Sequence, residues 1–306
     1  ATWLARRWST DEARGLFAGL AAHAIRPLTS PTTGALGLTF GVTAHGYGWP
    51  AAVGGSAAIT RAMAAELELL GGRIETGHRV DDLPDADVVM FDTAPQAAAD
   101  IAGDRVPSRI SRALRRWRSG PGVFKVDLAV EGGVPWTNAW CRKAGTVHVG
   151  GTIEQIAHAE QEVTDGRMPE RPFCLVAQQY LADPGRSAGD VHPVWAYAHV
   201  PAGYDGDATE AVISQIERFA PGLRDRIVGR STTSPAQWEA YNPNYVGGDI
   251  GGGSNDPFQL LMRPRLSPQP YAIGDGLYLC SASTPPGAGV HGMSGFHAAT
   301  LAVDRL

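Results

Sequence analysis

Cysteine is scarce in this sequence: there are three among 306 residues, at Cys141, Cys174 and Cys280. They are far apart and odd in number, and they form neither a C-x-x-C pair nor a disulfide framework. We therefore expect free thiols in a reducing compartment, which makes the predicted location cytoplasmic.

Long apolar runs are absent as well. No run reaches the length of about 18 residues that a membrane-spanning helix requires, so no integral membrane segment is expected. Residues 1–8 do not have the composition of a signal peptide, and the sequence has no methionine at position 1. We therefore expect a processed product or a fragment of a longer chain.

The sequence has no excess of basic residues. Lys and Arg number 26 against 31 Asp and Glu, and the formal net charge of -5 provides no general attraction for nucleic acid. A local basic run does occur at Arg105, Arg109, Arg112, Arg115, Arg116 and Arg118. Nucleic-acid binding and peripheral contact with an anionic membrane are two interpretations of this run, but a solvated helix face is the simplest.

Several catalytic and metal-binding motifs are missing. The nine histidines form no H-E-x-x-H motif, so no metal site is predicted. No G-x-S-x-G motif occurs, which disfavours an α/β-hydrolase. The carboxylate neighbours Asp81 with Asp82 and Glu160 with Glu162 are most simply interpreted as surface charges. No catalytic residue is therefore predicted.

Glycine and proline, by contrast, are frequent, with 38 and 22 residues. They occur without a collagen period or a low-complexity tract, so they indicate turns and close backbone approaches. Hydrophobic residues make up 43% and charged residues 19%, which suits a substantial core. At about 150 residues per domain, the length corresponds to two domains or one large one.

The first third of the sequence has the pattern of an α/β unit. Residues 9–23 form an amphipathic helix pattern with a capping box at Ser9 and Glu12, and residues 56–70 form another. A stretch rich in glycine, threonine and proline separates the two. Short strands are expected at 73–76 and 87–91, without hairpin turns between them, which favours an open sheet.

The middle of the sequence favours an antiparallel sheet interrupted by one helix. Strands are expected at 123–130, 146–150, 173–179 and 194–200, and the helix is expected at 208–220. Residues 241–270 are rich in loop-forming residues. A strand at 277–280, a glycine-rich loop and a helix at 290–305 close the chain, and we expect them to return to the first layer.

The glycine loop contains the only G-x-G-x-x-G match, at Gly287, Gly289 and Gly292. Too few residues follow it for the next strand of an NAD-binding βαβ unit, so that interpretation is rejected. A strand, glycines and a helix still direct backbone N–H groups and the positive helix end at one point, where a flat ring or a phosphate could approach. A tight turn with close helix packing is the alternative.

Four segments carry a resemblance to a known family. The sequence resembles the phytoene desaturase-like enzymes of the flavin amine oxidase superfamily at Gly276–Ala299, Gly54–Val80, Ala86–Pro95, and Tyr241–Ile250 with Arg263-Pro264 behind it. The resemblance implies an FAD-binding Rossmann-like domain and a mostly antiparallel β substrate domain, in the α/β (α+β) class. It also implies a helical and loop segment near the substrate at 1–53, FAD-domain segments at 54–105 and 246–306, and the substrate domain at 106–245.

The sequence departs from the family in two places. The family begins with a G-x-G-x-x-G strand–turn–helix, and nothing before Gly54 supplies that unit. We therefore expect an incomplete FAD domain, whose missing N-terminal segment belongs to the same gene product or to a separate chain. The segment 79–87 is also short, where many relatives have a β-hairpin.

The resemblance implies cofactor and substrate positions. The residues implied to contact FAD are Val80, Thr93, Ala94, Ser281, Ala282, Ser283, Gly289, Val290 and Met293. Those implied to lie near a small apolar substrate are Tyr47, Trp49, Tyr241, Tyr245 and His291. Ordinary packing is the alternative for the strand, methionine and aromatic positions, and helix capping without a catalytic duty is the alternative for His291.

Taken together, these features predict an FAD-dependent oxidoreductase that transfers a hydride from an apolar substrate to flavin. Protein groups in such an enzyme mainly orient the substrate and exclude water, which agrees with the lack of an acid–base pair. Two alternatives remain at this point: a non-catalytic binding or assembly subunit that kept the fold, and a redox-neutral flavin-dependent isomerase.

Overall fold

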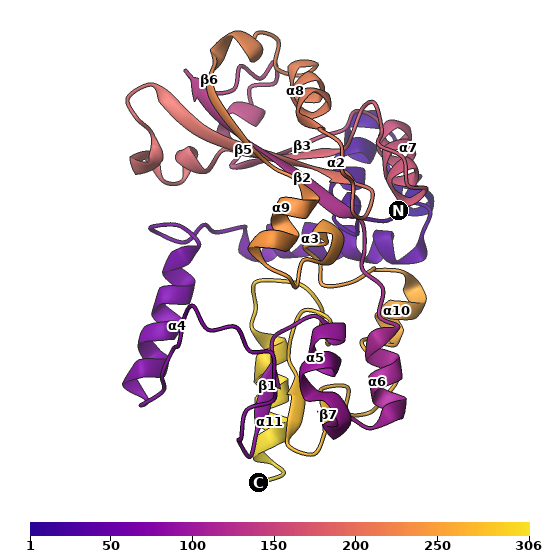
Figure 1. Ribbon diagram of the computed structural model, residues 1–306. Coiled ribbons are helices and arrows are strands. Elements are labelled where there is room, and N and C mark those ends of the chain that lie inside the picture. Colours follow the sequence, from indigo (N-terminus) through magenta and orange to yellow (C-terminus); the bar gives the residue numbers. More distant parts are fainter.

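Two separate sheets organise the chain (Figure 1). The computed structural model describes residues 1–306. One sheet has five strands in the order β3-β4-β5-β2-β6, and the other has three in the order β1-β8-β7. Helices pack on both, so the predicted mixture of helices and sheets is confirmed.

The five-stranded sheet is antiparallel throughout, as the middle of the sequence indicated. Its strands are β2 (Gly122–Glu131), β3 (Thr146–Val149), β4 (Cys174–Ala177), β5 (Val191–Val200) and β6 (Ile227–Thr233). Along β2, Val126, Leu128 and Val130 alternate as buried residues, since every second side chain points to the same face. They share a core with Val212 and Ile216 of α8 (Thr209–Glu217), which covers this face.

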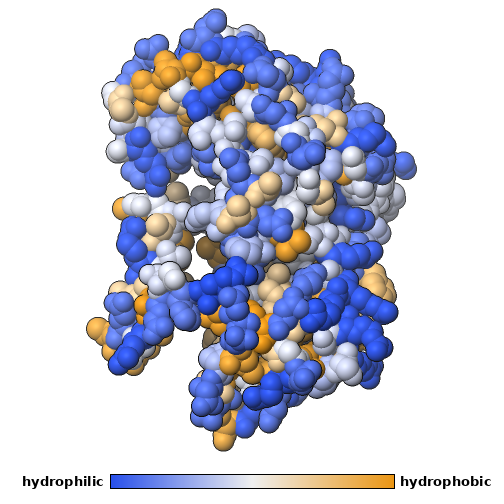
Figure 2. Space-filling view, in the orientation of Figure 1, coloured by the Kyte–Doolittle hydropathy of each residue, from blue (hydrophilic) through white to orange (hydrophobic).

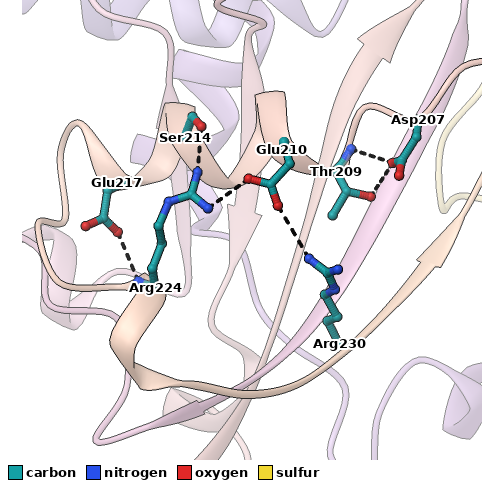
Figure 3. A network of polar contacts seen from close by, with 7 residues as sticks. All are labelled: Asp207, Thr209, Glu210, Ser214, Glu217, Arg224 and Arg230. Carbon is teal, nitrogen blue, oxygen red and sulfur yellow. Dashed lines mark hydrogen bonds and ion pairs between the residues drawn. The ribbon is translucent and has the colours of Figure 1, made fainter.

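A polar network fastens α8 to the segment that follows it (Figure 3). Arg224 donates to Glu210 at 2.8 Å and to Ser214 at 2.7 Å, while its backbone N–H donates to Glu217 at 3.0 Å. Arg230 of β6 reaches the same Glu210 at 3.4 Å. These groups are largely exposed, so the network sets the path of the turn more than it adds stability.

A second helix interrupts the antiparallel pattern, which the sequence analysis did not predict. It is α7 (Ile153–Thr164), and it begins at a capping box formed by Thr152 and Gln155. Its apolar face, with Ile153 and Ile156, packs against α2 (Asp11–Ala22). The side chain of Thr10 caps α2 by accepting from Ala13 N, so the predicted cap at Ser9 was one residue too early.

The glycine- and threonine-rich stretch contains a helix that the sequence analysis did not anticipate. This helix, α3 (Pro31–Tyr47), starts with proline in its first turn and packs against α2. A Cβ atom on Gly37 would lie 3.0 Å from the Phe17 ring and 3.2 Å from the Ala21 methyl group. Glycine therefore allows a close approach of the two helices, and packing rather than intrinsic propensity accounts for α3.

The three-stranded sheet brings a strand from the first third of the chain together with two strands near its C-terminus. β1 (Val89–Phe91) pairs in parallel with β8 (Leu277–Leu279), and β8 pairs antiparallel with β7 (Ala272–Gly274). The C-terminal unit thus returns to the earlier layer, as expected. The helices α5 (Pro95–Ala102) and α6 (Ser108–Arg115) share a core with one face, and α11 (Met293–Val303) covers the other through Tyr278.

The segment before β1 differs most from the prediction. Residues 73–76 form no strand, because no neighbouring strand lies beside them to satisfy their backbone groups. The helix α4 (Ala57–Leu69) forms as predicted, yet none of its residues is buried. Its apolar positions Ile59, Met63 and Leu67 are exposed, and the helix stands away from the rest of the chain (Figures 1 and 2).

Short helices complete the structure. The remaining α-helices are α1 (Thr2–Ala5), α9 (Pro235–Tyr241) and α10 (Pro257–Leu261). The 3-10 helices are η1 (Gly103–Arg105), η2 (Cys141–Lys143), η3 (Gln179–Leu181), η4 (Pro184–Arg186), η5 (Arg224–Arg226) and η6 (Val246–Gly248). Among all these helices, none is long and apolar enough to span a bilayer.

Candidate functional site

The parallel pair β1 and β8 opens at one edge into a small cavity. Because both strands run in the same direction, the loops that follow them, Asp92–Ala94 and Cys280–Ser283, start side by side. These loops and the segment 242–252 enclose a cavity of about 200 Å³. We call it the serine cavity, after Ser281 and Ser283 in its wall.

The serine cavity has a mixed, largely polar lining of hydroxyl, amide and carboxyl groups. The Ser281 and Ser283 hydroxyls lie 2.7 Å apart and are both buried. The Ala94 N–H donates to the Asn244 side chain at 2.8 Å, which ties the loop after β1 to the segment beyond α9. Burial raises the pKa of the Asp92 carboxyl, which favours its neutral form.

The glycine loop lies between β8 and α11. Gly292 has the left-handed backbone conformation at the N-cap of α11, with φ of 62°, which a side chain would disfavour. The N-cap glycine has no side chain to cap the helix; instead the Met293 N–H donates to Nδ1 of His291 at 3.0 Å. His291 is thereby turned onto its own helix start.

A second and larger cavity adjoins the first. It measures about 530 Å³ and lies between the glycine loop at Gly287–Gly289 and the helix α3, where Leu36 and Phe40 form apolar walls. Ile250 lines both cavities. We call the second one the histidine cavity, because His23 closes it beside Tyr197 of β5.

The histidine at the cavity wall belongs to a buried cluster. Nε2 of His23 lies 2.8 Å from Nε2 of His148 on β3. Burial, with a further contribution from neighbouring imidazoles, lowers the pKa of His23 to about 3 and that of His148 to about 4. Both rings are therefore neutral near pH 7. Burial also raises the pKa of Tyr197 to about 12, so its phenol keeps its proton.

Glu160 corrects one interpretation of the sequence. It is a buried residue and not a surface charge: its carboxylate lies 2.7 Å from Nδ1 of His199, and both side chains are 1% exposed. The ring of Phe173 packs between His199 and His148. The pair joins α7 to β5. A carboxylate buried at this position without a hydrogen-bond partner would cost stability.

The structure brings about half of the predicted site residues together. Those that line the serine cavity are Thr93, Ala94, Ser281, Ala282, Ser283 and Tyr245. Gly289 lines the histidine cavity, and the exposed Trp49 makes an edge contact with Phe40 of its wall. Those that line neither cavity, all exposed except the half-buried Met293, are Val80, Val290, Met293, Tyr47, Tyr241 and His291.

The sequence analysis missed the histidine cavity almost entirely. His23, Phe40 and Tyr197 line it from three elements that are far apart in sequence. No spacing rule joins them, because α2, α3 and β5 meet only in the tertiary structure. Arg263 also lines it, and its only signal was its place in the segment that resembles the flavin family.

Comparison with solved structures identifies the fold. The chain superposes on an oxidoreductase from Methanosarcina mazei with a TM-score of 0.60 at 14% identity, covering 100% of this chain and 67% of that one. A putrescine oxidase bound to putrescine gives 0.57 at 17% identity, covering 99% and 66%. Cyclohexylamine oxidase from Brevibacterium oxydans IH-35A gives 0.53 at 14% identity, covering 99% and 67%. The predicted fold class is therefore confirmed, although these structures do not single out phytoene desaturase-like enzymes.

Comparison with known sequences finds only distant similarity. No protein-family model matches the chain. It is 24% identical over 234 residues to pyridine nucleotide-disulfide oxidoreductase domain-containing protein 2 from Rattus norvegicus. That match covers 72% of this chain and 37% of the rat protein, so the chain spans little more than a third of its relative.

Proposed function

We propose that this chain is the substrate-binding and C-terminal cofactor-binding portion of an FAD-dependent oxidoreductase that takes a hydride from an apolar substrate, as phytoene desaturase-like enzymes do. The observation that carries the proposal is the pair of adjoining cavities at the open edge of β1 and β8. One has a largely polar lining that includes small hydroxyl residues, the other is lined mainly by apolar surface, and they meet at Ile250. Ligands of open α/β sheets bind at such edges.

The residues of the serine cavity fit the middle of a dinucleotide. Part of its wall consists of small side chains and backbone at Thr93, Ala94 and Ser281–Ser283, which a ribityl chain or pyrophosphate could approach closely. Gly252 packs so tightly on this wall that a Cβ atom there would lie 2.8 Å from Ala282. These residues would hold the cofactor, and Gly289, Val290 and Met293 would lie nearest its ring.

When bound, FAD would supply the hydride acceptor. The chain's own residues would hold the substrate against it and exclude water. Leu36 and Phe40 provide apolar contact, while the neutral His23 leaves its part of the wall uncharged. Tyr245, at the mouth of the serine cavity, would contact the substrate nearest the ring, and Trp49 would extend the wall beyond Phe40.

We further propose that another polypeptide segment completes the FAD domain, from the same gene product or a separate chain. The exposed apolar side of α4, at Ile59, Met63 and Leu67, is a surface that such a segment would cover. β1 pairs with β8 on one side only, so its other edge is free to accept a strand. Val80, exposed in the segment between α4 and β1, would then lie near the adenine.

The test is flavin binding by the chain together with its N-terminal segment. We expect yellow protein with bound FAD, measured by absorbance and by quenching of flavin fluorescence. Gly289→Trp should abolish binding, because the added side chain would occupy the face offered to the ring. Gly145→Trp is the matched control, since a Cβ atom on Gly145 meets nothing within 4 Å. A completed protein that binds no flavin would instead favour the non-catalytic assembly subunit.

A further inference from the structure

Arg263 is a buried cation without a carboxylate partner. The residue is 5% exposed, yet no carboxylate lies within ion-pair distance of its guanidinium. Its Nε has no hydrogen-bond acceptor, and Nη2 makes only a long contact of 3.4 Å with the Gly251 carbonyl. Buried charges are normally paired, so a guanidinium left open in this way lacks an acceptor that the chain does not provide.

The nearest acidic residue is engaged elsewhere. Asp249 accepts from the Gly120 N–H at 2.6 Å and from the Gly251 N–H at 2.7 Å. Its carboxylate therefore shapes the loop and does not bind the guanidinium directly. On its other side, Arg263 lies over the ring of Trp117, with Cζ 5.6 Å from the centroid. This stacking fixes the plane of the guanidinium without satisfying its N–H groups.

The guanidinium is also directed at a ligand-sized space. Arg263 lines the histidine cavity beside Gly287. A Cβ atom on Gly287 would lie 2.7 Å from Nη1, so any larger residue there would cover the cation. No Asp or Glu lines this cavity, and its walls include Ala35, Leu36 and Leu260. The cavity thus combines apolar walls with a single permanent positive charge.

We propose that Arg263 binds an anionic oxygen group, a carboxylate by preference, on an otherwise apolar ligand in the histidine cavity. The assignment depends on the proposed function only in taking that ligand to be the substrate. Planar guanidinium groups bind carboxylates through two parallel hydrogen bonds, which would satisfy the N–H groups left free here. The pyrimidine edge of a bound cofactor is a second source of an anionic oxygen, and the experiment separates the two.

The test compares octanoate, octan-1-ol and octylamine as probes, titrated into the flavin-free protein by calorimetry. We expect octanoate to bind at least about 10-fold more tightly than the alcohol, since charge-assisted hydrogen bonds add affinity of this order. Arg263→Met should remove the preference and Arg263→Lys should keep part of it. Arg112→Met, the same change on the exposed side of α6, should leave it intact. Equal binding of octanoate and octanol by the unmodified protein would overturn the proposal.

A parallel titration with FAD separates the two sources of the anion. The protein could show no preference for octanoate while Arg263→Met weakens FAD binding about 10-fold or more. The anionic oxygen bound by Arg263 would then belong to the cofactor, and the substrate assignment would be wrong. An octanoate preference supports this inference even if the completed protein binds no FAD, a result that would contradict the proposed function. Circular dichroism monitors folding. If Arg263→Met unfolds, the preference of the unmodified protein and of Arg263→Lys for octanoate over octan-1-ol still tests the proposal.

Discussion

His23 and His148 share one hydrogen bond, Nε2 to Nε2 at 2.8 Å, although 125 positions separate them in the chain. One ring must donate and the other accept, so the pair holds a single proton between these two nitrogens. A second proton would place a positive charge in a buried site. This contact joins the end of α2 to β3 and closes the histidine cavity.

The histidine pair predicts that stability falls in mild acid. Both imidazoles have folded pKa values of about 3 and about 4, below the value of 6.5 without burial. The unfolded chain therefore binds more protons between about pH 4 and pH 6.5, and the free energy of unfolding falls as the pH falls through this window. Each ring should contribute a loss of about 1–2 kcal/mol between pH 6.5 and pH 5, measured by urea denaturation.

The double variant His23→Gln with His148→Gln tests whether these two histidines cause the pH dependence of the unfolding free energy. It should flatten the stability profile between pH 6.5 and pH 5, because neither side chain titrates. His78→Gln, a change at an exposed histidine, serves as the control and should keep the slope. An unchanged slope in the double variant would place the responsible groups elsewhere.

The buried pair of Glu160 and His199 predicts an asymmetric response to mutation. Glu160→Leu leaves a buried imidazole without its acceptor and should cost about 3–5 kcal/mol of unfolding free energy. Glu160→Leu combined with His199→Phe should recover much of this loss, because both polar groups are then replaced. Glu162→Leu removes only partly exposed contacts and should cost about 1 kcal/mol or less. Equal losses for Glu160→Leu and Glu162→Leu, measured by chemical denaturation, would refute this account.

The contact of α2 with α3 predicts opposite outcomes for two glycines of the same helix. Gly37→Ala places a methyl group 3.0 Å from the Phe17 ring and should destabilise by about 1–3 kcal/mol through overpacking. Gly41→Ala meets only Leu20, at an ordinary 3.8 Å, and should be neutral or stabilise by up to about 1 kcal/mol through helix propensity. Thermal unfolding followed at 222 nm by circular dichroism, a general helix signal, distinguishes them. The same sign for both variants would contradict the close packing described for Gly37.

The exposed side of α4 predicts a mutation that affects assembly and not stability. Met63→Lys should change the unfolding free energy of this chain by no more than about 0.5 kcal/mol, because no residue of α4 is buried. It should weaken binding of a separately produced N-terminal segment by about 10-fold or more, measured by calorimetry, since a lysine charge would be buried on association. Glu68→Lys, on a different side of α4, should bind normally. A stability loss in Met63→Lys alone would show that α4 packs within this chain.

The sequence predicted elements whose signal is local. The alternation along Gly122–Glu131, the helical spacing along Ala57–Leu69 and the strand–glycine–helix pattern after Leu277 each appear in the structure. Periodicity carries this information because it reports which side of an element is apolar, without reference to a partner. The family resemblance, and not periodicity, singled out Thr93, Ala94 and Ser281–Ser283, which the structure brings together in the serine cavity.

Other features depended on partners that no local pattern reveals. The expected strand at 73–76 has no neighbour to pair with, and α3 is a helix because Gly37 lets it pack on Phe17. Glu160 is buried because α7 lies over β5, where its carboxylate accepts from Nδ1 of His199.

The sequence by itself determined the elements with a strong local periodicity and the glycine loop that lines the histidine cavity. The tertiary structure alone decided that His23, Tyr197 and Arg263 share one cavity and that Nε of Arg263 has no hydrogen-bond acceptor. Local periodicity fixes which side of an element is apolar, whereas strand order and helix packing fix which distant polar groups meet when those sides are buried.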